Sequence, residues 1–173
     1  QQLYFELTQV ELDTLSQFGT IKTKVHFILQ LAYFKAKNQF FTFTFDDVRA
    51  DVDYVLAKFF KKTDVVFQGN ITRQRINQQK QIILNLFDYQ AWSVEQAIQV
   101  EAHIGELLRY YPKSHDAFRQ LLVYLDIQKI VIPTYRSLQD MFTQSFANER
   151  DRLDQLILLM PHGQQDGRAS CRE

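Results

Sequence analysis

The stretch from residue 20 to residue 37 most constrains what this chain can fold into. Apolar residues recur there at helical offsets, and others fall between them: Val25, Phe27, Ile28, Leu29, Leu31, Ala32, Tyr33, Phe34 and Ala36. This spacing predicts a helix. A helix that is apolar over much of its circumference must be covered on most sides. We therefore expect residues 20–37 to form the central helix of a helical bundle.

Few residues are available for tight turns, because the chain has 5 glycines and 3 prolines among its 173 residues. A β-sandwich or barrel needs many such turns, whereas long helices do not. Hydrophobic residues make up 46% of the chain, enough for a sizeable core. We predict an all-α fold, a bundle of about seven helices over residues 1–160. One domain is favoured over two small helical subdomains packed together. Residues 161–173 lack periodicity and are expected to be a disordered tail.

Two local motifs predict where further helices begin. Thr8 and Glu11 have the spacing of a capping box, which opens a helix with Leu12 and Leu15 on its apolar side.

Thr44 and Asp47 indicate a second start of this kind, with a helix over residues 45–60. Residues 40–45 alternate aromatic and polar side chains, as a strand would, but the chain offers no convincing partner strand. An extended connector is therefore predicted there.

Residues 72–86 form the candidate functional stretch. Its second half has an apolar stripe typical of a buried helix, with Ile76, Ile83 and Leu86 at helical offsets. Its first half is polar around the single apolar residue Ile76; the polar residues are Arg73, Gln74, Arg75, Asn77, Gln78 and Lys80. This end of the helix is expected to project from the core into solvent.

The side chains of this polar end suit DNA. Arginine and lysine neutralise phosphates, and arginine, asparagine and glutamine can form paired hydrogen bonds with guanine or adenine edges in the major groove. We predict that these six residues form the recognition surface of a helix-turn-helix-like DNA-binding architecture. The alternative is an ordinary solvated helix start.

The distribution of charge supports a defined docking face. The whole chain has 20 basic and 20 acidic residues and a net charge of zero, which argues against a general polyanion binder. Between residues 58 and 80, six basic residues stand against one acidic residue, a local balance of +5. Within this segment Lys61 and Lys62 are predicted to contact phosphates beside the recognition surface.

A second DNA contact is predicted at Tyr135 and Arg136. They follow Pro133 at the expected start of the last helix, where backbone amides point outward and can receive a phosphate. The alternative is a surface tyrosine and arginine beside a helix cap. Trp92 is expected to fill the core rather than to stack on a nucleic-acid base.

No metal, cofactor or catalytic site is predicted. Asp47 and Asp51 lie one helical turn apart and could share a magnesium ion. Carboxylates at a helix N-terminus already stabilise the helix dipole without a ligand, and this interpretation is preferred. The four histidines are scattered, at residues 26, 103, 115 and 162. They form no pair at ligand spacing.

An intracellular setting is expected. Cys171 is the only cysteine, which excludes an internal disulfide framework. The first residues lack the basic and apolar regions of a signal peptide, and no apolar stretch approaches the length of a membrane span.

The chain resembles the N-terminal (DUF4158-type) domain of Tn3-family transposases over about residues 3–160. The motifs that carry the resemblance are Tyr4-Phe5-x-Leu7-Thr8-x-x-Glu11-Leu12, Phe27-x-Leu29-Gln30-Leu31-x-Tyr33-Phe34 followed by Phe40, residues 73–80 with Ile83-Leu84 and Phe87-x-Tyr89, and Ile130-Val131-Ile132-Pro133-Thr134-Tyr135-Arg136-Ser137-Leu138. The four occur in the family's order at plausible spacing. Residues 161–173 depart from the family's pattern.

The resemblance implies a helical region that recognises double-stranded DNA, the terminal inverted repeats of a bacterial transposon. In that family, strand cleavage resides in a distant C-terminal domain with an Asp-Asp-Glu triad, so this chain is expected to bind DNA in the bacterial cytoplasm without cutting it. Two alternatives remain: a protein-interaction module through which the transposase associates with itself, and an inert truncated remnant.

Overall fold

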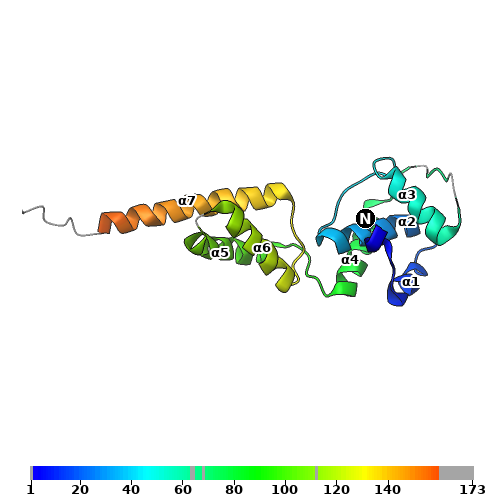
Figure 1. The fold of residues 1–173 in the computed structure, drawn as a ribbon, viewed down its shortest axis with the longest axis horizontal. Helices are drawn as coiled ribbons and strands as arrows, with labels where there is room; N and C mark the ends of the chain where they lie inside the picture. Colours follow the sequence, from blue (N-terminus) through cyan, green and yellow to red (C-terminus); the bar gives the residue numbers. More distant parts are fainter. Residues whose placement is uncertain (1, 63–64, 68, 112, 160–173) are drawn as a thin grey trace, which may run out of the picture. The chain divides into compact units, whose positions relative to one another are not determined.

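The computed structural model is all-α, as predicted, and describes residues 2–62, 65–67, 69–111 and 113–159 (Figure 1). Seven α-helices lie in these described residues, together with a 3-10 helix, η1, and a π-helical turn, η2. In chain order they are η1 (Gln2–Phe5), α1 (Gln9–Leu15), α2 (Ile21–Lys37), α3 (Arg49–Val55), η2 (Leu56–Phe60), α4 (Arg73–Phe87), α5 (Val94–Tyr110), α6 (Ser114–Ile127) and α7 (Tyr135–Leu159). The expected tail, residues 161–173, lies outside the described residues.

Contacts divide the chain into two compact units. Unit 1 comprises residues 1–97 and 122–134, and unit 2 comprises residues 98–121 and 135–173. Helices α5 and α6 each contribute residues to both units. The single domain over residues 1–160 remains a prediction.

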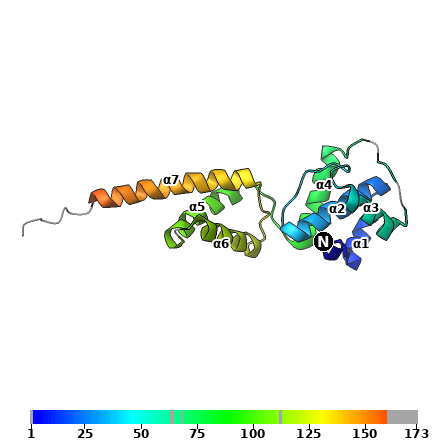
Figure 2. The ribbon, with the colours of Figure 1, turned by 45° about the horizontal axis from the view of Figure 1, so that its top comes forward.

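Helix α2 is the central element of unit 1, as its apolar circumference predicted. Phe27, Ile28, Leu29 and Leu31 are fully buried in one cluster with residues of α3 and α4. The helix begins after Thr20, whose side chain accepts a hydrogen bond from the amide of Thr23, and it ends at Lys37. In the views of Figures 1 and 2, α1, α3 and α4 lie around α2.

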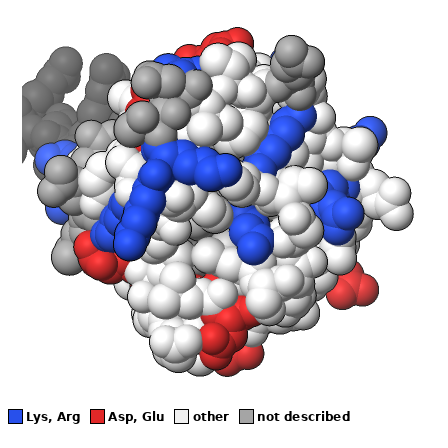
Figure 3. Space-filling view, turned by 90° about the vertical axis from the view of Figure 1, so that its right-hand side faces the viewer, with Lys and Arg blue, Asp and Glu red and all other residues white. Residues whose placement is uncertain are grey.

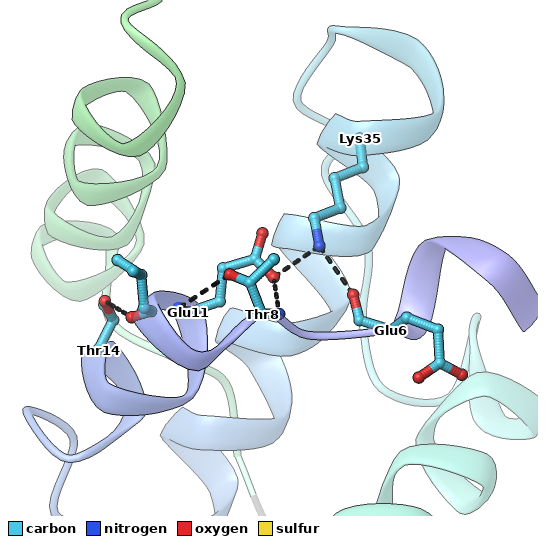
Figure 4. Close-up of polar contacts among 6 residues, drawn as sticks. Glu6, Thr8, Glu11, Thr14 and Lys35 are labelled. Atoms are coloured by element: carbon cyan, nitrogen blue, oxygen red, sulfur yellow. Dashed lines mark hydrogen bonds and ion pairs between the residues drawn. The ribbon is translucent and has the colours of Figure 1, made fainter.

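The predicted capping box opens α1 (Figure 4). The Thr8 amide donates to Glu11 Oε2 at 2.7 Å, and the Glu11 amide donates to Thr8 Oγ1 at 3.4 Å. Glu11 is buried and also binds Lys35 Nζ of α2 at 2.7 Å, so the cap is tied to the central helix. Leu12, expected on the apolar side, is instead 39% exposed, because Glu11 and Thr14 take the inward positions of this short helix.

The segment before α3 is an extended connector, as predicted, with no helix or strand over residues 40–44. The Thr44 amide donates to Asp47 Oδ2 at 2.7 Å, so the expected capping motif is present. However, residues 45–48 form a turn and α3 begins only at Arg49. The expected helix over residues 45–60 is therefore shorter, and its last turn is the π-helical η2.

Unit 2 packs α5 against parts of α6 and α7. Its buried residues include Val100, Ile104 and Leu107 of α5, Leu121 of α6 and Leu138 of α7. Aromatic rings add to this core, with the ring centroids of Phe118 and Phe142 6.0 Å apart.

Candidate nucleic-acid interface

Helix α4 carries the predicted recognition surface and has the predicted bounds. Thr72 caps its start, since the Thr72 hydroxyl accepts a hydrogen bond from the Arg75 amide at 3.4 Å. Ile83 and Leu84 are buried in the core of unit 1. The C-terminal half of α4 is thus anchored, and its N-terminal half carries the polar side chains.

Five of the six predicted recognition residues are exposed: Arg73, Gln74, Arg75, Asn77 and Gln78. Arg75 Nη1 donates to Gln78 Oε1 at 2.9 Å, which aligns two of these side chains along the helix surface. The remaining residue, Lys80, is half-buried, and its Nζ lies 5.3 Å from the centre of the Phe40 ring. Burial lowers the pKa of Lys80. The expectation that all six side chains project into solvent is therefore wrong for Lys80.

The exposed face of α4 continues beyond the predicted set. Gln81 and Asn85 are also exposed, and Gln81 Nε2 donates to Asn85 Oδ1 at 3.2 Å. Together with Gln74 and Gln78 they form a row of amides with offsets of four, three and four residues, which share one side of a helix. We call these four residues the amide row. The helical period alone could have identified Gln81 and Asn85.

A buried polar contact fixes the opposite side of α4 against α2. Gln79 is fully buried, and its Nε2 donates to the carbonyl of Thr23 at 2.9 Å. Its Oε1 lies 2.6 Å from His26 Nδ1. An amide oxygen can only accept, so Nδ1 of His26 carries the proton and the imidazole is held in one tautomer. Gln79 occupies the core stripe with Ile76 and Ile83, at three- and four-residue offsets.

The environment of His26 keeps its imidazole neutral. The ring stacks on Phe43 at 5.1 Å between centroids and meets Phe45 edge-on at 6.0 Å. Burial lowers the pKa of His26; the Gln79 hydrogen bond partly opposes this change, and the charge of Lys80 adds to it.

Acid should therefore destabilise the protein through His26. In the unfolded chain a histidine takes up its proton near pH 6.5, whereas the folded protein resists protonation to a lower pH. The stability contributed by neutral His26 is complete above about pH 6.5. It falls as the pH drops below this value toward the lower pKa of the folded protein, by up to about 1.4 kcal/mol per pH unit. Urea unfolding at pH 7.5 and pH 5.5 measures this loss. The His26→Gln variant should lose less stability than the wild type over the same interval. A wild-type slope in His26→Gln would contradict the assignment.

Basic side chains border the start of α4. Lys22 Nζ donates to the carbonyl of Asn70 at 3.5 Å, which places the first turn of α2 beside the segment that leads into α4. Lys61 and Lys62 are exposed after η2. Lys58 belongs to the same basic segment, but its Nζ lies 2.6 Å from Glu6 Oε1, so its charge is balanced. Figure 3 shows one face of unit 1 with several lysine and arginine side chains in the middle and acidic side chains mainly toward the edge.

Tyr135 and Arg136 lie in the other compact unit. Both are exposed in the first turn of α7, which begins at Tyr135 as predicted. Six of the ten predicted contact residues lie on α4, whereas Tyr135 and Arg136 belong to unit 2. Their joint role with α4 remains a prediction.

The acidic side chains near α3 have partners within the protein. Asp51 accepts the hydroxyl of Tyr33 at 2.6 Å, and burial together with this contact raises the pKa of Tyr33. Asp53 pairs with Arg49 at 3.1 Å, and the two hydrogen bonds from Thr44 lower the pKa of Asp47. Across the residues that the structure describes, no group of three or more His, Cys, Asp or Glu side chains could hold a metal ion. None of the helices described there is long and apolar enough to cross a bilayer.

These features define an all-α domain with one polar helix face at the surface of its first unit. The sequence matches the profile of a family described as a domain of unknown function, DUF4158, over residues 1–145. The chain belongs to this family, which is known as the N-terminal domain of Tn3-family transposases. No curated protein and no solved structure matches the chain.

Proposed function

We propose that this domain binds double-stranded DNA through the exposed face of α4, and that its natural target is the terminal inverted repeat of a transposon in the bacterial cytoplasm. The observation that carries the proposal is the composition of that face: Arg73 and Arg75 stand beside the amide row, and none of these side chains is needed to hold the core. An α-helix fits the major groove, where guanidinium and amide groups discriminate base edges. We assign no residue to DNA cleavage.

The family supports the choice of DNA as partner. A transposase must find the ends of its element before it cuts, and an N-terminal domain with a polar helix face suits that step. The neutral charge of the chain also fits, since attraction to DNA would then depend on a local face and not on total charge.

Fluorescence anisotropy tests the proposal directly. A labelled duplex with a transposon end and a scrambled duplex of equal length are titrated at low and near-physiological salt. Tighter binding to the transposon end that persists at the higher salt supports the proposal, because phosphate contacts alone weaken steeply with salt. Equal binding of both duplexes that vanishes with salt would overturn sequence recognition.

Replacing Lys61 by alanine should weaken binding to both duplexes by the same factor. A lysine that touches only phosphate carries no sequence information, so its loss should reduce the slope of log K against log salt by about one. Lys58→Ala is the matched control, because Lys58 lies one helical turn away and already pairs with Glu6. A change in the ratio between the two duplexes would contradict a pure phosphate contact at Lys61.

Self-association is a second candidate function, favoured by the last turns of α7. Leu153, Leu156, Ile157, Leu158 and Leu159 are all exposed there. Apolar side chains grouped at the surface are typical of protein interaction sites. Sedimentation velocity over a range of micromolar concentrations separates the two functions, since a dimer that forms without DNA supports self-association.

A further inference from the structure

We propose that a hollow beside α4, formed by Trp92, Lys80, Asn77 and Gln81, binds one unpaired nucleotide of DNA. The proposal rests on the proposed DNA binding for the identity of its ligand. It adds a second mode of contact at the border of the duplex-reading face, with which it shares Asn77 and Gln81.

Trp92 is not the core residue that the sequence predicted. Its side chain is half-buried, and it is absent from the core cluster of unit 1. The backbone on both sides of it is fixed. Before it, the Gln90 amide donates to the carbonyl of Lys129 at 2.7 Å in an isolated parallel bridge. After it, the Ser93 hydroxyl accepts from the Glu95 amide at 3.2 Å and caps α5. The backbone at Trp92 is thus fixed beside α4, and its side chain lies outside the core cluster.

The hollow has a volume of about 330 Å3 and lies entirely within unit 1. Trp92 and Phe40 supply aromatic walls, and Leu84 and Val131 supply further apolar surface. Phe40 is itself supported from behind by Phe34, with the rings stacked at 4.9 Å. The volume of the hollow falls at the lower end of the range of small-molecule sites.

Lys80 provides a cation at this hollow without an anion to balance it. Among the described residues, its ammonium group has no ion pair or hydrogen bond, and it lies 5.3 Å from the centre of the Phe40 ring. Partial burial makes an unbalanced charge unfavourable. A phosphate group at this position would supply both the missing charge and the missing hydrogen-bond acceptors.

Asn77 and Gln81 complete the set of chemical groups. They lie one helical turn apart on the same side of α4 as Lys80, and both line the hollow. Amides donate and accept hydrogen bonds, as the edge of a nucleobase requires. An aromatic surface for the base, a cation for the phosphate and amides for the base edge are together the requirements of a single nucleotide.

Trp92 is the only tryptophan of the chain, so its fluorescence reports on this hollow alone. The intact chain is titrated with single-stranded oligothymidylate and with an abasic oligonucleotide of the same length. We expect oligothymidylate to quench the emission in a saturable manner, because a base stacks on the indole, and the abasic strand to leave it unchanged. The Lys80→Gln variant should bind oligothymidylate at least tenfold more weakly. Lys129→Gln is the matched control, since Lys129 also lies over an aromatic ring, that of Tyr89 at 4.9 Å, but does not line the hollow.

These titrations test the nucleotide site independently of duplex binding. Unchanged emission with oligothymidylate, equal quenching by the abasic strand, or full affinity in Lys80→Gln would each overturn the nucleotide site. If the duplex with a transposon end still bound specifically in the anisotropy experiment, the proposed function would stand without the hollow. Quenching by oligothymidylate without specific duplex binding would support the hollow and overturn the major-groove proposal. Circular dichroism of the wild type and both variants checks that the fold is retained.

Discussion

Replacing Arg73 or Arg75 by alanine should weaken binding to a transposon-end duplex by about 1–3 kcal/mol for a side chain that reads a base, which is roughly a 5- to 150-fold loss. The expected loss is larger for the cognate duplex than for a scrambled one, so specificity should fall together with affinity. The physical reason is that a guanidinium group can donate two parallel hydrogen bonds to the edge of guanine, and alanine offers none.

These two substitutions should remove contacts with DNA without disturbing the fold. Both arginines are exposed in the first turn of α4, and neither contributes to the core of unit 1. Arg75 contacts only Gln78 among the side-chain partners described for it. The free energy of unfolding should therefore change by less than about 0.5 kcal/mol, as for most surface substitutions. A loss of binding in the variants then reflects a lost contact with DNA.

Arg49→Ala provides the matched control on the same unit. Arg49 is half-buried at the surface, but it lies on α3 and pairs with Asp53 at 3.1 Å. Its removal should leave the ratio between the two duplexes unchanged. If both Arg73→Ala and Arg75→Ala bound the transposon end as tightly as the wild type, the assignment of α4 as the recognition helix would be wrong.

The bounds of the long helices could be predicted because they depend on nearby residues. Thr20 and Thr72 cap α2 and α4 at the expected positions, and the apolar stripe of each helix follows a simple period. The amide row follows the same helical period. Its members Gln81 and Asn85 could therefore have been identified from the sequence alone. The start of α3 was placed four residues early, because a capping motif at Thr44 and Asp47 stabilises a turn as readily as a helix.

Contacts between distant segments could not be predicted in this way. Lys58 belongs to a basic segment of the sequence, yet Glu6, far away in the chain, balances it. Lys80 has the charge of a phosphate contact, but Phe40 partly covers it. Trp92 is large and aromatic, which favoured a core position, while the bridge between Gln90 and Ile130 holds it at the surface instead. Each of these outcomes depends on which segments meet in space.

Gln79→Ala should be the most destabilising of the α4 substitutions, with an expected loss of about 1–3 kcal/mol in the free energy of unfolding. Gln79 is fully buried and satisfies two groups of α2, the Nδ1–H of His26 and the carbonyl of Thr23. Alanine leaves the buried Nδ1–H of His26 without a partner, and an unsatisfied buried group costs about 1–3 kcal/mol. The Thr23 carbonyl loses only its second hydrogen bond, because it also lies within the hydrogen-bonded turns of α2. Urea unfolding at pH 7.5 measures the loss.

Gln78→Ala is the control for this prediction, because Gln78 is the adjacent glutamine and points into solvent. Its loss should change stability by less than about 0.5 kcal/mol while weakening DNA binding. The two neighbouring glutamines would then separate the two roles of α4: Gln79 positions the helix against α2, and Gln78 contacts the ligand. Equal stability of the two variants would show that the buried contact between His26 and Gln79 does not hold α4 in place, and the geometry of the recognition face would need another source.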